Sequence, residues 1–386
     1  MADCNIQMNF KKFDVAIIGG GPAGSSAAML LSRMGYSVSI IEKKSFPREV
    51  LCGEFISKEV VEFLQENLLY EEFLSLNPNP ITSFRFSGEN GKDLISSLKF
   101  TAYGIKRSRL DNFLLSKAKE NGAEIFQPAE VREIIKQTDG YLLKIKSGVQ
   151  EEFTLNSKII IAAYGKQNIL DKNSGRDFYR KKSKLNGVKF HIDKVHFNSF
   201  NLEEIQIYTG RGVYCGLNAV DKNTITLCFL EKRNKLQYSP KDLLLQLSRE
   251  NIKFNALLSQ DFFDYVETLP VYGTGNIYFG KRDIVNEGIF YIGDAAGVIA
   301  PLVGDGIGMA VQSAGLVSDI LFRNNLVQEK AGIEFEKEWS NMFLRRISLA
   351  GIIQKSVLNN SFRNPGIKMV SLFPGVLSTI IKYTRG

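Results

Sequence analysis

The pattern of apolar and polar positions predicts one βαβ unit at the start of the chain. Residues 14–19 (DVAIIG) form a nearly continuous apolar run, as a strand buried in a parallel sheet requires. The small and apolar residues that follow predict a helix that ends at Gly35, a residue type common just after a helix. Residues 37–41 (SVSII) predict a second strand, and Glu42 follows it directly. This order of elements is typical of α/β proteins.

The pattern changes in the middle of the chain and changes back near its end. Residues 81–103, and several segments between residues 168 and 279, alternate apolar and polar positions as antiparallel strands do. A single helix, near residues 240–250, is expected among them. The segment GIFYIGDAAG then predicts a strand and a turn of small residues, and long helices follow from about residue 306. The first and last α/β segments are therefore expected to form one discontinuous domain.

The turn between the first strand and helix carries the glycine pattern GxGxxG, written GGGPAG in this chain. Gly19 permits the tight turn, Gly21 lets the backbone approach a pyrophosphate, and Gly24 lets the helix pack closely on the strand. Pro22 and Ala23 complete the loop. The free N–H groups at the helix N-terminus would face the phosphates of a dinucleotide.

Glu42 ends the second strand about 20 residues beyond this loop, which is the position of the acidic residue in dinucleotide-binding units. A carboxylate there accepts hydrogen bonds from ribose hydroxyls and repels a 2′-phosphate. The sequence therefore predicts FAD or NAD, rather than NADP, in this unit.

These patterns predict an α/β fold with a Rossmann-type dinucleotide-binding domain, an antiparallel β-sheet substrate domain and C-terminal helices. The expected organisation is as follows: residues 1–80, 101–167 and 280–326 form the cofactor domain, residues 81–100 supply strands to the substrate sheet, residues 168–279 form the substrate domain, and residues 327–386 form the helical segment.

Composition narrows the classes of partner. The net charge of +8 favours acidic partners such as nucleotide phosphates, anionic lipid or an acidic carrier protein. No stripe of basic and aromatic residues predicts nucleic-acid binding. The four cysteines form no CxxC pair and no apolar leader is visible, which favours a cytoplasmic protein with reduced thiols. No apolar run has transmembrane length, so at most peripheral membrane contact is expected. For the apolar and basic residues 362–386, a helical lid packed on the main domain is favoured over docking on a membrane surface or a lipid-carrying partner. With only His191 and His196, both treated as ordinary polar positions, no metal site is expected.

Four segments together resemble a superfamily of FAD-dependent oxidoreductases. They are the βαβ unit, FPREVLCGEFIS, RSRLD and GDAAGVIAPLVGDGIGMA. The superfamily includes geranylgeranyl reductases, flavin-dependent halogenases and p-hydroxybenzoate hydroxylase-like monooxygenases, and this chain is most similar to the geranylgeranyl reductase-like branch. The resemblance implies FAD and the following contacts to it: Gly19, Gly21, Pro22, Ala23, Gly24, Glu42, Lys43, Arg48, Cys52, Gly53, Arg107, Val131, Gly165, Gly293, Asp294, Pro301, Gly304, Gly306 and Ile307.

The segment GDAAGVIAPLVGDGIGMA can also be interpreted from its residue types alone. Gly304, Asp305 and Gly306 precede a helix that starts near Ile307. Its positive dipole end would face the flavin N1/O2 edge, where negative charge accumulates when the flavin is reduced. The resemblance implies that Asp294 binds the ribityl hydroxyls.

The chain departs from its relatives at three places. Tyr164-Gly165 stands where many have Asp-Gly, a motif tied to NADPH handling, so the electron donor is left open between NAD(P)H, another reductant and an electron-donor protein. GVYCGLNAV at residues 212–220 replaces the aromatic-Trp-Phe-Pro stretch of prenyl reductases. The only tryptophan, Trp339, lies in the C-terminal helices, so the tryptophan-rich motif of the halogenases is missing.

Cys52 and Tyr214 are the candidate catalytic residues. Cys52 would need a nearby cation to become reactive, and Arg48 is the candidate. Tyr214 and Cys215 are neighbours on a strand and must point to opposite faces, so one of them should line the substrate cavity. Cys215 and Cys228 are expected to be packed thiols.

Three functions stay open for the chain. The favoured one is a monooxygenase that hydroxylates an apolar or aromatic biosynthetic intermediate, small and possibly carrier-bound or lipid-like. The second is a reductase of C=C bonds in an isoprenoid or lipid, as the resemblance to geranylgeranyl reductases implies. The third is a flavoprotein that serves as maturation partner of another protein.

Overall fold

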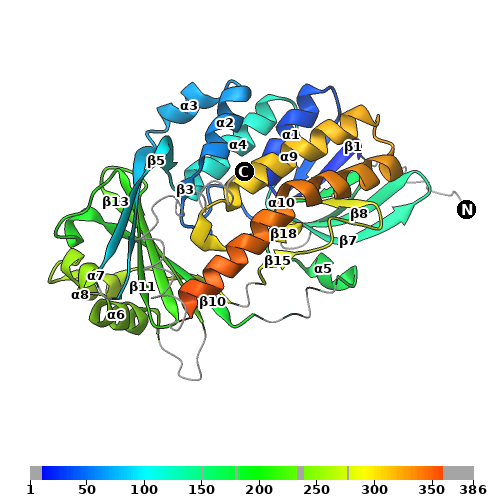
Figure 1. Ribbon diagram of the computed structural model, residues 1–386. Coiled ribbons are helices and arrows are strands. Elements are labelled where there is room, and N and C mark those ends of the chain that lie inside the picture. The colour runs from blue at the N-terminus through cyan, green and yellow to red at the C-terminus, as the bar shows by residue number, and fades with distance from the viewer. Residues whose placement is uncertain are drawn as a thin grey trace, which may run out of the picture.

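The computed structural model describes residues 11–359, apart from residues 90, 149–150, 177, 179–180, 182, 233–238 and 276–277. Cys4 and residues 362–386, for which membrane contact was considered, lie outside the described residues. The described residues form two eight-stranded sheets that lie side by side, each covered by helices, and one small two-stranded sheet (Figure 1). The predicted α/β class is confirmed.

The first sheet contains the predicted βαβ unit. Its strand order is β16-β17-β9-β1-β2-β6, and β1 pairs in parallel with both β2 and β9. The strand predicted from GIFYIGDAAG, β17, pairs in parallel with β9, so the late segment does join the N-terminal unit. The strands are β1 (Lys11–Ile18), β2 (Val38–Ile41), β6 (Glu124–Phe126), β7 (Ala129–Gln137), β8 (Gly140–Ser147), β9 (Glu151–Ala162), β16 (Val285–Asn286) and β17 (Ile289–Tyr291).

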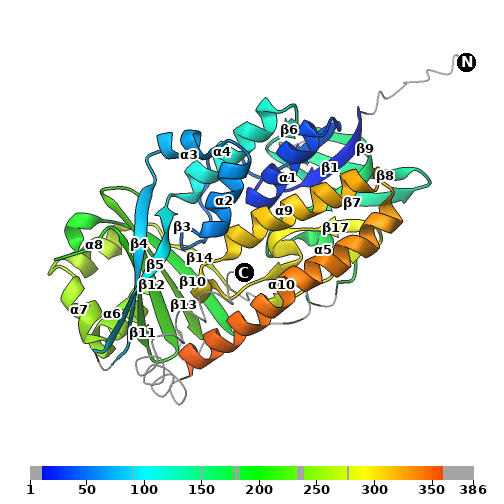
Figure 2. The same ribbon diagram turned by 45° about the horizontal axis from the view of Figure 1, so that its top comes forward.

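Helices cover this sheet because their apolar faces need a partner. The first helix packs against α4 and α9, which lie beside it in both ribbon views (Figure 1, Figure 2). The helices of this half are α1 (Pro22–Arg33), α2 (Lys58–Glu66), α3 (Tyr70–Ser75), α4 (Arg107–Glu120), α5 (Ile169–Asn173), α9 (Gly306–Arg323) and α10 (Gln328–Leu358).

The second sheet is mixed rather than purely antiparallel, which corrects the prediction. Its order is β14-β10-β13-β12-β11-β4-β5-β3, and β11 pairs with β4 in parallel. A parallel pair is possible because a long excursion through the first sheet connects these strands, whereas a tight hairpin would force them antiparallel. The strands are β3 (Phe55–Ile56), β4 (Asn79–Ser87), β5 (Asp93–Gly104), β10 (Leu185–Asp193), β11 (Glu204–Gly210), β12 (Val213–Ala219), β13 (Thr224–Lys232) and β14 (Tyr272–Thr274).

One face of the second sheet, the outer face, packs on helices and carries a separate core of apolar side chains, among them Phe190, Leu217 and Phe229. The prediction of a single helix here is wrong, because three short ones follow one another: α6 (Pro240–Glu250), α7 (Ile252–Leu257) and α8 (Phe262–Thr268). Asn251 ends α6 and also caps α7, accepting a hydrogen bond from Phe254 N–H, so one residue both stops and restarts the helix. The opposite, inner face of the sheet turns toward the first half of the molecule.

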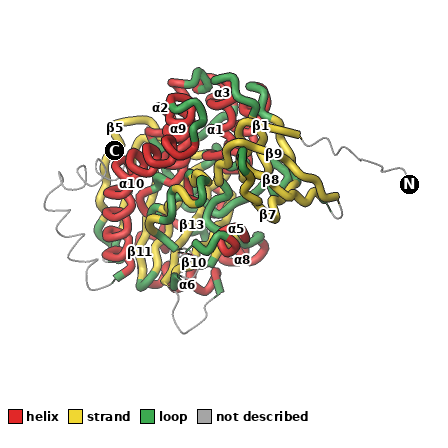
Figure 3. Tube along the Cα trace, turned by 90° about the vertical axis from the view of Figure 1, so that its right-hand side faces the viewer, coloured by secondary structure: helices red, strands yellow, loops and turns green. Residues whose placement is uncertain are grey.

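The long C-terminal helix α10 ties the two halves together. It runs beside α9 and reaches the second sheet at its far end (Figure 2, Figure 3). Phe335, Trp339 and Phe343 bury their rings in the core of the first half. Two strand pieces, β15 (Gly280–Lys281) and β18 (Gly297–Val298), pair beneath this helix. No helix among the described residues is long and apolar enough to cross a membrane.

We expect Trp339→Ala to lower the free energy of unfolding by about 3–5 kcal/mol, because its buried ring leaves a cavity between α10 and the first sheet. Urea unfolding followed by circular dichroism would measure this, since the change removes the only tryptophan. Ile333→Ala, on an exposed position of the same helix, is the control and should change the free energy by no more than about 0.5 kcal/mol. Equal losses in both variants would contradict this packing.

Candidate flavin and substrate site

The glycine loop between β1 and α1 has the geometry that a pyrophosphate site requires. Gly19 has φ +109°, and a Cβ added there would lie 2.6 Å from the Ala163 carbonyl oxygen. A Cβ on Gly24 would overlap the Gly19 carbonyl oxygen. A Cβ on Gly21 would meet only the Arg48 Nη2 atom, at 3.7 Å. Gly19 and Gly24 are thus needed for packing, whereas the space over Gly21 is open to a ligand.

Glu42 is fixed at the end of β2 by backbone donors. Its Oε2 accepts a hydrogen bond from Gly20 N–H and its Oε1 accepts one from Lys44 N–H, both at 2.8 Å. The carboxylate is nearly buried beside the loop. This is the place from which the predicted contact to a ribose would be made.

Arg48 lies over the loop with unused hydrogen-bonding capacity. Its Nη2 is 3.7 Å from Glu42 Oε2 and 3.9 Å from Asp111 Oδ2, and its guanidinium covers the Phe46 ring at 4.8 Å. Its buried Nε has no partner among the described residues. A buried donor beside an open glycine loop and an uncapped helix N-terminus fits a dinucleotide pyrophosphate. The residues present therefore fit FAD, which would supply the redox chemistry when bound.

The GDAAG turn lies against this loop, although it is distant in sequence. A Cβ on Gly293 would come within 3.0 Å of Ala23 Cβ, and Gly293 N–H donates to Ser313 Oγ of α9. Asp294 belongs to a short 3-10 helix, Gly293–Ala295, which follows β17. The structure therefore brings Asp294 to the same edge of the sheet as the glycine loop.

The N-terminus of α9 is built as the sequence suggests. Gly304 has a left-handed φ of +67°, and Asp305 precedes the helix without capping it through its side chain. Instead the buried Asp305 carboxylate lies 3.3 Å from Ser57 Oγ and 3.3 Å from Arg346 Nη1 of α10. Pro301 is exposed and Ile307 is buried on either side of this turn.

Four further residues that are predicted to contact the cofactor differ in how far they are exposed. Lys43 is exposed and pairs with Glu130 at 2.9 Å. The Val131 side chain is buried in the first core, so only its backbone is available to a ligand. Gly165 follows β9 with φ +84°, and Gly53 has open space around its Cα.

Arg107 begins α4 and forms a two-point ion pair with Asp111, at 2.7 and 2.9 Å. Burial lowers the pKa of the Arg107 guanidinium, but Asp111 and Cys52 raise it more, so the net pKa is raised. Arg107 is therefore a cation beside Cys52, in addition to the Arg48 that the sequence suggested. Asp111 is fully buried and was missed, although the RxxLD pattern contains it.

Tyr164 takes part in a buried network of polar side chains. Its hydroxyl donates to Asp171 Oδ1 at 2.6 Å, and that carboxylate pairs with the buried Arg176 at 2.7 Å. Burial, and then the Asp171 charge, raise the pKa of Tyr164 well above its ordinary value. Asp171 comes from α5, so the sequence offered no local signal for this network.

The cysteine and tyrosine candidates divide between the two faces of the second sheet. Cys215 packs in the outer core, while Tyr214 is on the inner face and donates to Gln354 Oε1 of α10 at 3.2 Å. Burial raises the pKa of both groups well above their ordinary values. The predicted opposite orientation is confirmed. Cys228 is on the inner face near Cys52, and burial raises its pKa to about 12.

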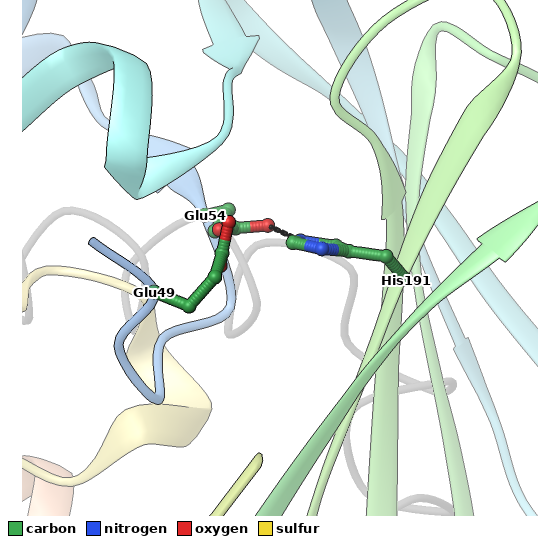
Figure 4. Close-up of side chains that lie close together, drawn as sticks. All are labelled: Glu49, Glu54 and His191. Carbon is green, nitrogen blue, oxygen red and sulfur yellow. Dashed lines mark hydrogen bonds and ion pairs between the residues drawn. The ribbon is translucent and has the colours of Figure 1, made fainter. Parts of the chain in front are cut away.

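The largest group that the sequence analysis missed is a charged cluster between the two halves (Figure 4). Glu54, next to Gly53, is fully buried and has a left-handed φ of +59°. Its Oε1 accepts from Lys189 Nζ at 3.0 Å, and its Oε2 lies 2.6 Å from His191 Nε2. Lys189 also reaches Glu49 at 2.7 Å. Glu49, Glu54 and His191 could supply metal ligands, but the Lys189 ammonium binds both carboxylates.

Beside this cluster the inner face is apolar. Tyr214, Leu230 and Leu51 meet Val298 and Leu302, which precede the α9 turn, and Leu358 of α10 closes the group. The Cys52–Ser57 loop therefore lies between the α9 N-terminus, reached through Ser57, and the inner face of the second sheet.

We expect Gly21→Ala to weaken FAD binding by about tenfold or more while leaving the fold intact, because the added methyl group occupies the open space over the loop. Titration of the protein with FAD, followed by flavin fluorescence, would measure it. Gly315→Ala, inside α9 with open space around it, is the matched control and should bind FAD as the unchanged protein does. Unchanged affinity in Gly21→Ala would count against this site.

The ionisation of Glu54 should stabilise the fold above its pKa. Burial raises the pKa of this carboxyl, but hydrogen bonds and charge from His191 and Lys189 outweigh it and set the pKa at about 2, against an ordinary 4.5. The stabilisation, roughly 3 kcal/mol, is present above pH 4.5 and is lost as the pH falls toward 2. The unfolding free energy of Glu54→Gln should therefore fall less steeply in this window. Glu62→Gln, on an exposed pair with Lys58, should keep the original slope.

Comparison with known proteins agrees with this geometry. The family described as FAD binding domain matches residues 12–323. Digeranylgeranylglycerophospholipid reductase 3 of Methanosphaera stadtmanae is 26% identical over 373 residues, 90% of this chain and 89% of that protein. The 1H-pyrrole-2-carbonyl (peptidyl-carrier protein) chlorinase of Pseudomonas fluorescens is 22% identical over 85% of this chain and 80% of its own length.

Solved structures give the same result for the fold. The flavin-dependent brominase Bmp2 superposes with a TM-score of 0.75 at 19% identity, over 97% of this chain and 94% of that chain. The sequence left FAD and NAD open at the glycine loop, and the family match selects FAD. The chain belongs to the FAD-binding domain family and is a flavin-dependent oxidoreductase.

Proposed function

We propose that this enzyme is an FAD-dependent monooxygenase that hydroxylates an apolar or aromatic biosynthetic intermediate. The observation that carries the proposal is the composition of the inner face. Its apolar group around Tyr214 and Leu230 adjoins the turn at Leu302, and a charged cluster ends it near Glu54. An apolar substrate with one polar group would place its apolar part against Tyr214 and Leu230 and its polar group at the charged cluster. Such a substrate would also keep water from the flavin while oxygen reacts.

The α9 N-terminus supports a flavin that must be held reduced before it meets oxygen. Asp305 does not cap the helix through its side chain, so the first amides of α9 can face a ligand. The positive end of the helix favours the negative charge of the reduced flavin. Because the backbone of α9 would provide this stabilisation, the negative charge of the reduced flavin does not require a lysine or arginine side chain beside it.

The form of the substrate follows from the surface charge and the relatives. The chain carries a net charge of +8, which suits an acidic carrier protein or an anionic lipid. By their names, one relative acts on a pyrrole group held on a carrier protein and another on a glycerophospholipid. We infer a small apolar or aromatic substrate linked to such a carrier or lipid, with NAD(P)H or an electron-donor protein as reductant.

A second candidate is reduction of a C=C bond in an isoprenoid or lipid. The specific observation in its favour is the likeness to the Methanosphaera reductase over nearly the full length of both chains. The same inner face would accept an isoprenoid, but a purely hydrocarbon chain would leave the polar cluster at Glu54 without a role. For this reason we rank hydroxylation first.

Rapid mixing of the photoreduced, FAD-loaded protein with oxygenated buffer tests the choice. A monooxygenase should show a long-lived absorbance spectrum that belongs to neither reduced nor oxidised flavin, because its site would keep water from the flavin. Direct return to oxidised flavin, both alone and with aromatic compounds present, would contradict the proposal and favour the reductase. Oxygen consumption in the same samples provides the control for complete reoxidation.

A further inference from the structure

The charged cluster at Glu54 is more tightly constrained than a solvent-exposed ion pair. Glu54 has a left-handed backbone, which costs a non-glycine residue roughly 1–3 kcal/mol and persists only where the surroundings enforce it. Here its side chain is fully buried and bonded to three elements of the fold, α4, β10 and β13. Strain of this kind clusters at functional sites, so the outlier points to a role beyond packing.

Glu54 itself has no capacity left for a substrate. Its Oε1 accepts from Lys189 Nζ and from Arg107 N–H, both at 3.0 Å. Its Oε2 accepts from His191 Nε2 and from the Thr226 hydroxyl. These four donors fill the roughly four acceptor positions of a carboxylate. Glu54 is therefore an ionised holder of other groups, in agreement with its pKa of about 2.

The hydrogen bond to Glu54 decides which nitrogen of His191 carries hydrogen. An ionised carboxylate can only accept, so His191 Nε2 must be the donor across the 2.6 Å contact. The other ring nitrogen, Nδ1, then carries the lone pair of the neutral imidazole. About 17% of the His191 side chain remains accessible, and its ring lies 6.5 Å from that of Tyr272. Nδ1 is thus the acceptor nitrogen of this tautomer.

The neighbouring side chains of Lys189 and Cys228 are not suited to accept a proton. Lys189 is locked between Glu49 and Glu54, and its pKa is raised by these carboxylates against the effect of burial. Cys228 has a pKa of about 12 because of burial. Among the described residues of the cluster, His191 is the group with a nitrogen that can receive a proton.

The formal charges of the cluster's carboxylates and lysine do not balance. Glu49 and Glu54 carry two negative charges against one positive charge on Lys189, and the nearby Arg107 is balanced by Asp111. The arrangement resembles the carboxylate–histidine pairs that hold an imidazole in one tautomer and stabilise its charged form.

We propose that His191, oriented by Glu54, is the general base that takes a proton from the substrate, and that the substrate is an aromatic compound with a dissociable O–H or N–H group. The substrate O–H or N–H bond breaks and an N–H bond forms at His191 Nδ1. The electron pair stays on the substrate oxygen or nitrogen, and no oxidant or reductant is consumed in this step. Because electrophilic oxygenation of a ring needs high electron density, the deprotonated ring is the reactive form.

This inference rests on the proposed hydroxylation, but part of it can be tested without catalysis. The chain has two histidines, so imidazole-15N labelling gives two sets of signals. His191 should carry its hydrogen on Nε2, opposite Glu54, whereas His196 should carry it on Nδ1, opposite Asp261 at 2.9 Å. Glu54→Gln should abolish the fixed tautomer of His191 and leave His196 unchanged. A His191 with hydrogen on Nδ1 in the unchanged protein would overturn the proposal.

Binding of 4-nitrophenol to the FAD-loaded protein tests the base directly, because its absorbance reports its own ionisation. At a pH below the pKa of the free phenol, the bound probe should be nitrophenolate in the unchanged protein. His191→Gln should bind it as the neutral phenol and about ten- to a hundredfold more weakly, the loss expected for one charge-assisted hydrogen bond. His196→Gln is the matched control and should behave as the unchanged protein.

The outcomes separate this inference from the proposed function. Failure to bind the probe, or equal ionisation in His191→Gln and the unchanged protein, would overturn the role of His191. Direct return to oxidised flavin in the oxygen experiment, combined with nitrophenolate binding that depends on His191, would remove the hydroxylation and leave the base in place.

Discussion

The two oxygens of the Glu54 carboxylate bind groups from three separate parts of the fold. Lys189 and His191 come from β10, Thr226 comes from β13, and the Arg107 amide begins α4 of the first half. An ionised carboxylate in a buried place costs several kcal/mol unless donors surround it. The loop that carries Cys52 and Gly53 is therefore fixed only when both sheets are in position, so a segment that the sequence predicts to face the flavin depends on the contact between the two sheets.

A second buried ion pair fixes the other side of the same site. Asp305, which precedes α9, binds Arg346 of α10, and Gln354 further along α10 binds the Tyr214 hydroxyl. One helix thus holds the turn that would face the flavin and the inner face that would face the substrate. These contacts fix the turn and the inner face relative to one another, as flavin chemistry that depends on position would require.

The sequence predicted the parts of the molecule whose signals are local. The GGGPAG loop, its flanking strands and Glu42 lie within one βαβ unit, where periodicity and residue type determine the geometry. Glu54 and Lys189, by contrast, are 135 residues apart and meet only through the pairing of whole sheets. The three-helix cover of the second sheet was missed for a related reason, because short helices give too few turns to show a period.

The register of the second sheet sets the length of substrate that the inner face can hold. His191 on β10 lies opposite Thr226 on β13, which lies opposite Asn218 on β12, and Tyr214 is four residues further along β12. Two strand spacings are roughly 10 Å and four residues are about 13 Å, so the polar cluster and the Tyr214 end are on the order of 16 Å apart. A single ring spans less than half of this distance. A ring bound at His191 would therefore not reach the apolar end near Tyr214, which suits the proposed substrate linked to a larger partner.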